Sequence, residues 1–200
     1  MSPTYLIRSA WSLFLMMAIA APVLAANPME EVKQTTDKTL SIVANPALKA
    51  PAKATERQRL IHQAVDERFD WEEMARRSLA THWASRTAEE RKEFVGLFAD
   101  LLERTYMEKL EDYSGEKVVY EGETKEGDYA TVKVKIITQK NKDIPVEYRL
   151  KKDGNGWFIY DVSIEAVSLV NNYRIQFNSI LLQSSYENLV KRLREKVELK

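Results

Sequence analysis

The chain has 200 residues, a length typical of one domain with at most a short appendage. Its 30 basic and 30 acidic side chains cancel, so it lacks the basic excess of nucleic-acid-binding proteins. It contains no cysteine, which excludes disulfides, thiolate metal sites, cysteine nucleophiles and anchors on an acylated cysteine.

The first 25 residues are typical of a secretory signal peptide. Arg8 is the only charged residue before Glu30, residues 10–26 are nearly all apolar, and Val23 and Ala25 supply the small residues of a cleavage site. A transmembrane anchor is the alternative, but 17 residues are at the lower limit for a span and Pro22 shortens the run. We therefore expect residues 1–25 to be removed and residues 26–200 to form a single domain outside the cytoplasm.

The amino-terminal half of this domain, about residues 28–113, is predicted to be helical. Two helices flank a linker at 44–54 that carries two prolines. Capping boxes beginning at Asp70 and Thr87 predict the start of two more helices. The second of these carries apolar residues at a spacing of 3.6 and is expected to end at Gly115.

The pattern then changes to that of a sheet over about residues 116–165. Apolar and polar residues alternate in 129–138 and 144–151, and a shorter strand precedes them. The turn sequence 153–156 leads into a fourth strand, 157–164, which is apolar on both faces except for Asp161 and Ser163. Such a strand is expected to be central, or to be backed by a helix on one side and a cavity on the other. Helical periodicity returns over about 168–198, and a capping box beginning at Ser184 predicts that a second terminal helix starts there. The order predicts an α+β fold, a curved antiparallel four-stranded sheet with packed N- and C-terminal helices.

Motifs for catalysis and metal binding are missing from the sequence. His62 and His82 are the only histidines and match no zinc motif, and no nucleophile elbow or phosphate-binding loop occurs. No catalytic residue, metal ligand or cofactor is therefore predicted. Asp161 is the exception, because a carboxylate among aromatic residues in a strand needs partners or a raised pKa. It could act as a base in a pocket, or it could fix Arg174 or a backbone amide, and we favour the structural role.

Apolar and aromatic residues are abundant, but a hollow core and a filled core have the same composition. From the residues alone, the chain is an exported α+β domain that could hold a hydrophobic cavity.

One run, GWFIYDVSIEAVSLVNNYRIQF at 156–177, resembles the signature of the toluene-tolerance, or MlaC-type, protein family. The resemblance extends over about residues 30–198. A departure is Ala166, where the family usually has glycine. Weaker matches lie upstream at Phe69-Asp70, Ala75, Leu79, Trp83, Thr87, Arg91, Phe94, Tyr106 and Tyr148-Arg149-Leu150.

The resemblance implies an NTF2-like cone of curved sheet and helices, and a function in lipid transport. Such a protein would be a soluble periplasmic carrier that holds the acyl tails of glycerophospholipid. It would shuttle the lipid, as cargo, between an outer-membrane lipoprotein–porin complex and an inner-membrane ABC transporter complex, and so maintain outer-membrane lipid asymmetry. A monomer is expected. The alternatives are an exported adaptor that binds no lipid and an NTF2-like enzyme that uses Asp161.

Elementary energetics suit a carrier. A phospholipid with about 30 buried methylenes carries roughly 24 kcal/mol of transfer cost, at about 0.8 kcal/mol each. Both tails must therefore be hidden from water, and no catalytic group is needed. On this interpretation the interior is expected to be partly empty and open at one end.

The expected lipid contacts are apolar residues of the long helix, the sheet and the segment after it. Strand parity places Trp157 and Val162 on opposite faces unless a bulge intervenes. Arg149 and Arg174 could meet the headgroup or pair with Asp161 or Glu165, and we favour pairing. The nine expected contacts are Phe98, Leu101, Tyr106, Tyr148, Trp157, Val162, Ile164, Val167 and Leu169.

Overall fold

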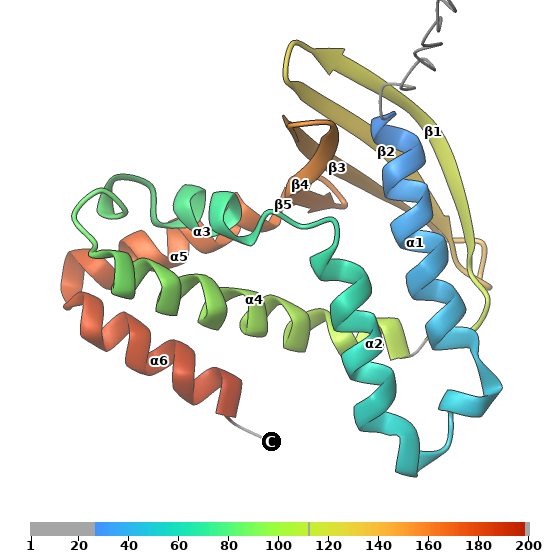
Figure 1. Cartoon of the computed structure of the whole chain (residues 1–200), viewed down its shortest axis with the longest axis horizontal. Coiled ribbons are helices and arrows are strands. Elements are labelled where there is room, and N and C mark those ends of the chain that lie inside the picture. The colour runs from blue at the N-terminus through green and yellow to red at the C-terminus, as the bar shows by residue number, and fades with distance from the viewer. Residues whose placement is uncertain (1–26, 112, 199–200) are drawn as a thin grey trace, which may run out of the picture.

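A computed structural model describes residues 27–111 and 113–198 (Figure 1). The predicted signal peptide lies outside these residues. Within them, no helix combines the length and apolar character that crossing a membrane requires. The elements in chain order are α1 (Pro28–Ala44), η1 (Pro46–Leu48), η2 (Pro51–Lys53), α2 (Ala54–Asp66), α3 (Trp71–Leu79), η3 (Ala80–His82), α4 (Ala88–Glu111), β1 (Lys117–Glu126), β2 (Tyr129–Ile137), β3 (Asp143–Asp153), β4 (Gly156–Ile164), β5 (Val167–Ser168), α5 (Leu169–Gln183) and α6 (Tyr186–Glu198).

The predicted α+β class and the curved antiparallel sheet are confirmed, but the number of strands is wrong. The sheet has five strands in the order β1-β2-β3-β4-β5. The extra strand, β5, has two residues and pairs with the end of β4. It forms because Glu165 and Ala166 both adopt positive φ angles, 48° and 66°, which turn the chain back along the edge of β4. Two residues are too few for a period of two to appear in a sequence.

The fourth strand, β4, is next to last in the sheet but has partners on both sides. β3 pairs with one side of β4. On the other side, β5 pairs with its end, and the backbone of residues 68–70 pairs with its middle. The Ile159 amide donates to the carbonyl of Arg68, and the Asp70 amide donates to the carbonyl of Ile159, both at 2.8 Å.

The predicted capping box at Thr87 forms completely, whereas the one at Asp70 forms only in part, because the Asp70 amide bonds Ile159 and the Glu73 carboxylate pairs with Arg76 and Arg77. The Asp70 carboxylate accepts the amide three residues on at 2.9 Å. The Thr87 hydroxyl accepts the Glu90 amide at 3.2 Å, and the Glu90 carboxylate accepts the Thr87 amide at 2.8 Å. The box expected at Ser184 is displaced by one residue, because the Ser185 hydroxyl caps α6 instead.

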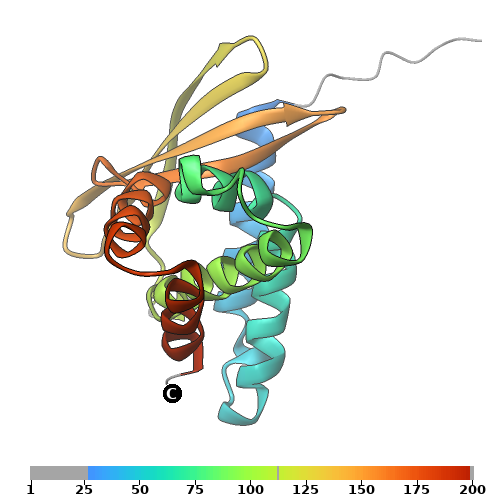
Figure 2. The ribbon, with the colours of Figure 1, turned by 90° about the vertical axis from the view of Figure 1, so that its left-hand side faces the viewer.

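The helices form two groups around the sheet (Figures 1 and 2). α1 packs on β1 and β2, and α2 packs on α1. α3 and α5 pack on each other and against β4, and α4 and α6 complete this second group. Glu31 fastens α1 to the sheet, since its carboxylate accepts the Trp157 amide at 2.9 Å and pairs with Arg68.

Candidate functional site

A β-bulge decides which side chains share a face of the sheet. Along β3 and β4 the pairing skips one residue, Tyr160. The extra residue shifts the alternation of side chains by one position. Trp157 and Ile159 therefore lie on the same face as Val162 and Ile164. The parity conflict in the predicted contacts is thereby resolved. We call this the inner face, because the helices cover it.

Burial along the inner face changes from one end to the other. Near the β1–β2 and β3–β4 turns its side chains are sealed, with exposed fractions of 5% or less: Ala130, Val132, Leu150, Trp157 and Ile159. At the opposite end, the apolar side chains are only half-buried: Val118, Ile136, Ile144 and Ile164. The sheet therefore offers an apolar surface that is closed at one end and partly open to solvent at the other.

The helices contribute a second apolar region, made of aromatic rings. Phe98 of α4 meets Tyr173 and Phe177 of α5 edge to face, with centroids 5.3 and 5.6 Å apart. Phe94 meets Phe177 in the same way at 5.5 Å. These rings belong to one contiguous core with the sealed residues of the sheet.

The structure places eight of the nine expected lipid contacts in or beside this core. Phe98, Leu101, Trp157, Val162 and Leu169 are buried, whereas Tyr106, Tyr148 and Ile164 are half-buried and pack against it. Tyr148, Trp157, Val162 and Ile164 share the inner face. Val167 is not brought to them, because it lies on β5 with 55% of its surface exposed.

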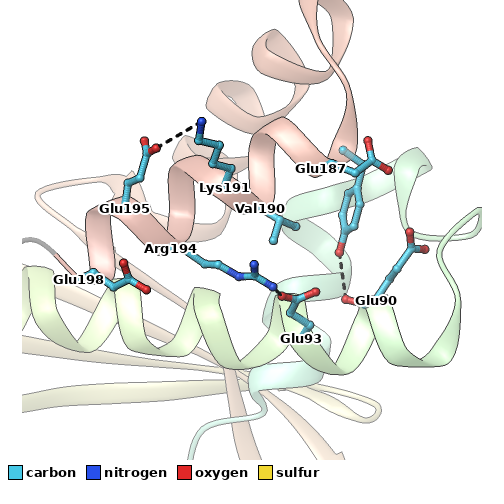
Figure 3. Close-up of a pocket in the computed structure, with 9 residues that line it drawn as sticks. Glu90, Glu93, Glu187, Val190, Lys191, Arg194, Glu195 and Glu198 are labelled. Atoms are coloured by element: carbon cyan, nitrogen blue, oxygen red, sulfur yellow. Dashed lines mark hydrogen bonds and ion pairs between the residues drawn. The ribbon is translucent and has the colours of Figure 1, made fainter.

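Two grooves occur elsewhere on the described part of the chain. One, of about 450 Å³, lies between α4 and α6, where Arg194 pairs with Glu93 and the Tyr186 hydroxyl donates to the carbonyl of Glu90 at 2.9 Å (Figure 3). Burial raises the pKa of Tyr186 to about 12. The other, of about 460 Å³, is lined by residues that include Arg77 and Tyr160. Neither contains an expected lipid contact, so neither groove is the open interior that was expected.

Asp161 has the structural role that was favoured. It is 3% exposed, and it accepts hydrogen bonds from the Ser168 hydroxyl at 2.6 Å and from the Val170 amide at 3.1 Å. Arg149 lies 3.4 Å from it, whereas Arg174 bonds Asn171 instead. The carboxylate therefore holds the first turn of α5.

Among the described residues, one cluster could offer ligand atoms to a metal. His62 and Asp66 of α2 and Glu103 of α4 bring such atoms within 4.8 Å of one another. Both ring nitrogens of His62 already face a carboxylate, Glu103 on one side and Asp66, at 3.2 Å, on the other. Partial burial lowers the pKa of His62, but the Glu103 hydrogen bond and the surrounding carboxylates together raise it. The three side chains thus satisfy one another as an ion-pair network.

Sequence reasoning missed two polar residues that face the core, Thr36 of α1 and Tyr120 of β1. The Thr36 hydroxyl lies beside the phenols of Tyr120 and Tyr148. The short strand around Tyr120 was predicted, but its pairing with Val134, which puts Tyr120 on the inner face, depends on a register shift in β1 that no local pattern signals.

Comparisons with known proteins show similarity to a protein family, to a curated protein and to a solved structure. A family described as MlaC protein matches residues 33–195. The intermembrane phospholipid transport system binding protein MlaC of Haemophilus influenzae is 25% identical over 122 residues, which cover 58% of this chain and 57% of that protein. The chain thus spans little more than half the length of this curated relative. A phospholipid-binding protein from Ralstonia solanacearum, solved in complex with a phospholipid, matches with a TM-score of 0.77 and 25% identity, covering 86% of this chain and 97% of the other.

Proposed function

This chain belongs to the MlaC protein family, and on that premise we propose that it is a carrier of glycerophospholipid. The observation that carries the proposal is the structural likeness to the Ralstonia protein, which binds a phospholipid and is covered over 97% of its length. The apolar inner face, half-buried at one end, agrees with it.

The acyl tails would bind between the inner face and the helices. The proposed contacts are the eight predicted residues that line or adjoin the core; Val167, exposed on β5, is left out. Because the aromatic rings of α4 and α5 pack on one another, we infer that loading requires these helices to shift. The half-buried end of the inner face is the natural entrance, since fewer contacts must break there.

The setting of this activity follows from the family. We propose that residues 1–25 are cleaved as a signal peptide and that residues 26–200 act in the periplasm as a single, monomeric lipid-binding domain. The lipid is cargo rather than a cofactor, and the protein is not an enzyme. Its partners would be an inner-membrane ABC transporter complex and an outer-membrane lipoprotein–porin complex.

Native mass spectrometry of the purified protein, followed by lipid extraction, tests the carrier function. We expect glycerophospholipid to copurify. Val162→Trp, which enlarges a buried side chain of the inner face, should lower lipid occupancy, with about 1–3 kcal/mol of destabilisation from overpacking. The matched control is Lys133→Trp, an exposed position of β2 that faces away from the core.

The proposal fails if the wild-type protein copurifies without lipid and takes up none from phospholipid vesicles. In that case the adaptor alternative would gain support. Equal occupancy in Val162→Trp and Lys133→Trp would remove Val162 from the set of contacts.

A further inference from the structure

Three hydroxyl groups lie close together at the largely apolar inner face. The sheet register places Tyr120 of β1 beside Val134, and Tyr148 of β3 between Val132 and Val162. Both phenols therefore project from the face that the helices cover. Thr36 of α1 lies beside both of them.

The Tyr120 hydroxyl is buried and makes no hydrogen bond of ordinary geometry within the described residues; the Thr36 hydroxyl close by offers it only a weak interaction. The neighbouring Thr36 hydroxyl donates its proton to the carbonyl of Val32 at 2.8 Å. Burial raises the pKa of both phenols, that of Tyr148 to about 12, so both remain neutral and keep a proton to donate. A buried hydroxyl without a well-formed hydrogen bond is unfavourable, and each such group in a native protein calls for an explanation.

The position of these hydroxyls within the inner face points to a ligand. They lie between the sealed part of the inner face, such as Leu150, and its half-buried end, such as Ile136 and Ile144. In a phospholipid, the ester carbonyls likewise stand between the apolar tails and the solvated headgroup. These carbonyls accept hydrogen bonds and carry no proton of their own, so they complement a phenol donor.

We propose that the Tyr120 and Tyr148 hydroxyls donate hydrogen bonds to an ester carbonyl of the bound glycerophospholipid. This inference rests on the proposed carrier function. The two tyrosines set the depth of the lipid, because the tails then extend toward the sealed end and the headgroup toward the half-buried end. The tyrosines also give the site a preference for ester-linked over ether-linked lipids.

Paired lipids that differ only in this carbonyl provide the test. Partition from vesicles to the protein is measured for a diacyl phosphatidylcholine and for its dialkyl ether analogue of the same chain length. Tyr120→Phe should weaken uptake of the diacyl lipid about fivefold, the effect of one neutral hydrogen bond, and leave uptake of the ether lipid unchanged. Tyr148→Phe should act in the same way. Tyr129→Phe, which removes a phenol from a half-exposed side chain outside the core, is the control.

Thermal unfolding of the Tyr120→Phe protein, stripped of lipid, gives an independent readout. Since the hydroxyl makes no hydrogen bond of ordinary geometry within the described residues, its removal should leave the Tm unchanged or raise it. A lower Tm would overturn the inference, as would an equal loss of both lipids in Tyr120→Phe. If the wild-type protein takes up neither lipid, the carrier function itself is refuted. Uptake of both lipids that no tyrosine variant alters refutes the ester contact alone.

Discussion

Replacing Asp161 with asparagine tests whether this buried carboxylate supports the fold or performs chemistry. Its two oxygens have different partners. Oδ1 accepts a hydrogen bond from the Val170 amide, and Oδ2 accepts one from the Ser168 hydroxyl and faces Arg149. Asparagine has nearly the same shape, but its NH₂ group cannot accept a hydrogen bond. Asp161→Asn therefore removes one of the two bonds that hold the start of α5.

The size of the effect can be worked from these contacts. A hydrogen bond to a charged group contributes about 1.5–3 kcal/mol. The pair with Arg149 adds little, because the Arg149 side chain is 44% exposed and screened by water. We expect a loss of about 2–3 kcal/mol, which for a domain of this size lowers the Tm by about 4–12 °C.

Thermal unfolding followed by circular dichroism measures the change, and lipid extraction at low temperature measures occupancy. Occupancy should be retained, since Asp161 faces α5 rather than the core. Glu165→Gln is the control, because that carboxylate pairs with Lys142 on the surface and its loss should cost less than about 0.5 kcal/mol. An unchanged Tm in Asp161→Asn would refute the structural role. A turnover that disappears in this variant would favour the enzyme alternative.

Three further substitutions have defined outcomes. Ala166 has a φ of +66°, so Ala166→Gly should relieve backbone strain and, after the entropy gained by the unfolded chain, stabilise the protein by about 0.5–1 kcal/mol in a denaturant titration; destabilisation would contradict this. The raised pKa of His62 means that its pairing stabilises the fold fully below the unfolded pKa and that this contribution is lost as pH rises through the folded pKa. His62→Gln should therefore lower the free energy of unfolding more at pH 6 than at pH 9, by less than about 1 kcal/mol because the group is half-exposed, and equal effects at both pH values would exclude the pair. Thr87→Ala should cost about 1 kcal/mol through loss of the α4 cap, and an unchanged unfolding midpoint would show that the cap contributes nothing.

Features that depend on neighbours in the sequence were predictable. The side-chain caps at Asp70 and Thr87 require only a spacing of three residues, and both caps form. The alternation around Val132 and Val146 identified two strands because one side of each is buried. The resemblance in residues 156–177 supplied the family, which composition could not have done.

Features that depend on distant contacts were not predictable. The bulge at Tyr160 forms where the backbone of residues 68–70 pairs with the edge of β4, a contact across about ninety positions of the chain. Without the bulge, Trp157 and Val162 would have faced opposite sides. Similarly, Ser184 and Ser185 are equally good caps by composition, and only the geometry at the end of α5 selects Ser185.

The aromatic packing between α4 and α5 is compatible with a carrier on energetic grounds. The large cost in lipid transport is exposure of the tails to water, about 0.8 kcal/mol for each methylene. Inside the protein, a tail that displaces Phe98 or Tyr173 exchanges one set of apolar contacts for another, and this exchange costs far less than hydration. The aromatic rings can therefore pack on one another when no lipid is bound and pack on an acyl tail when lipid is bound. The half-buried end of the inner face, where Ile136 and Ile144 already contact solvent, is where that exchange can begin.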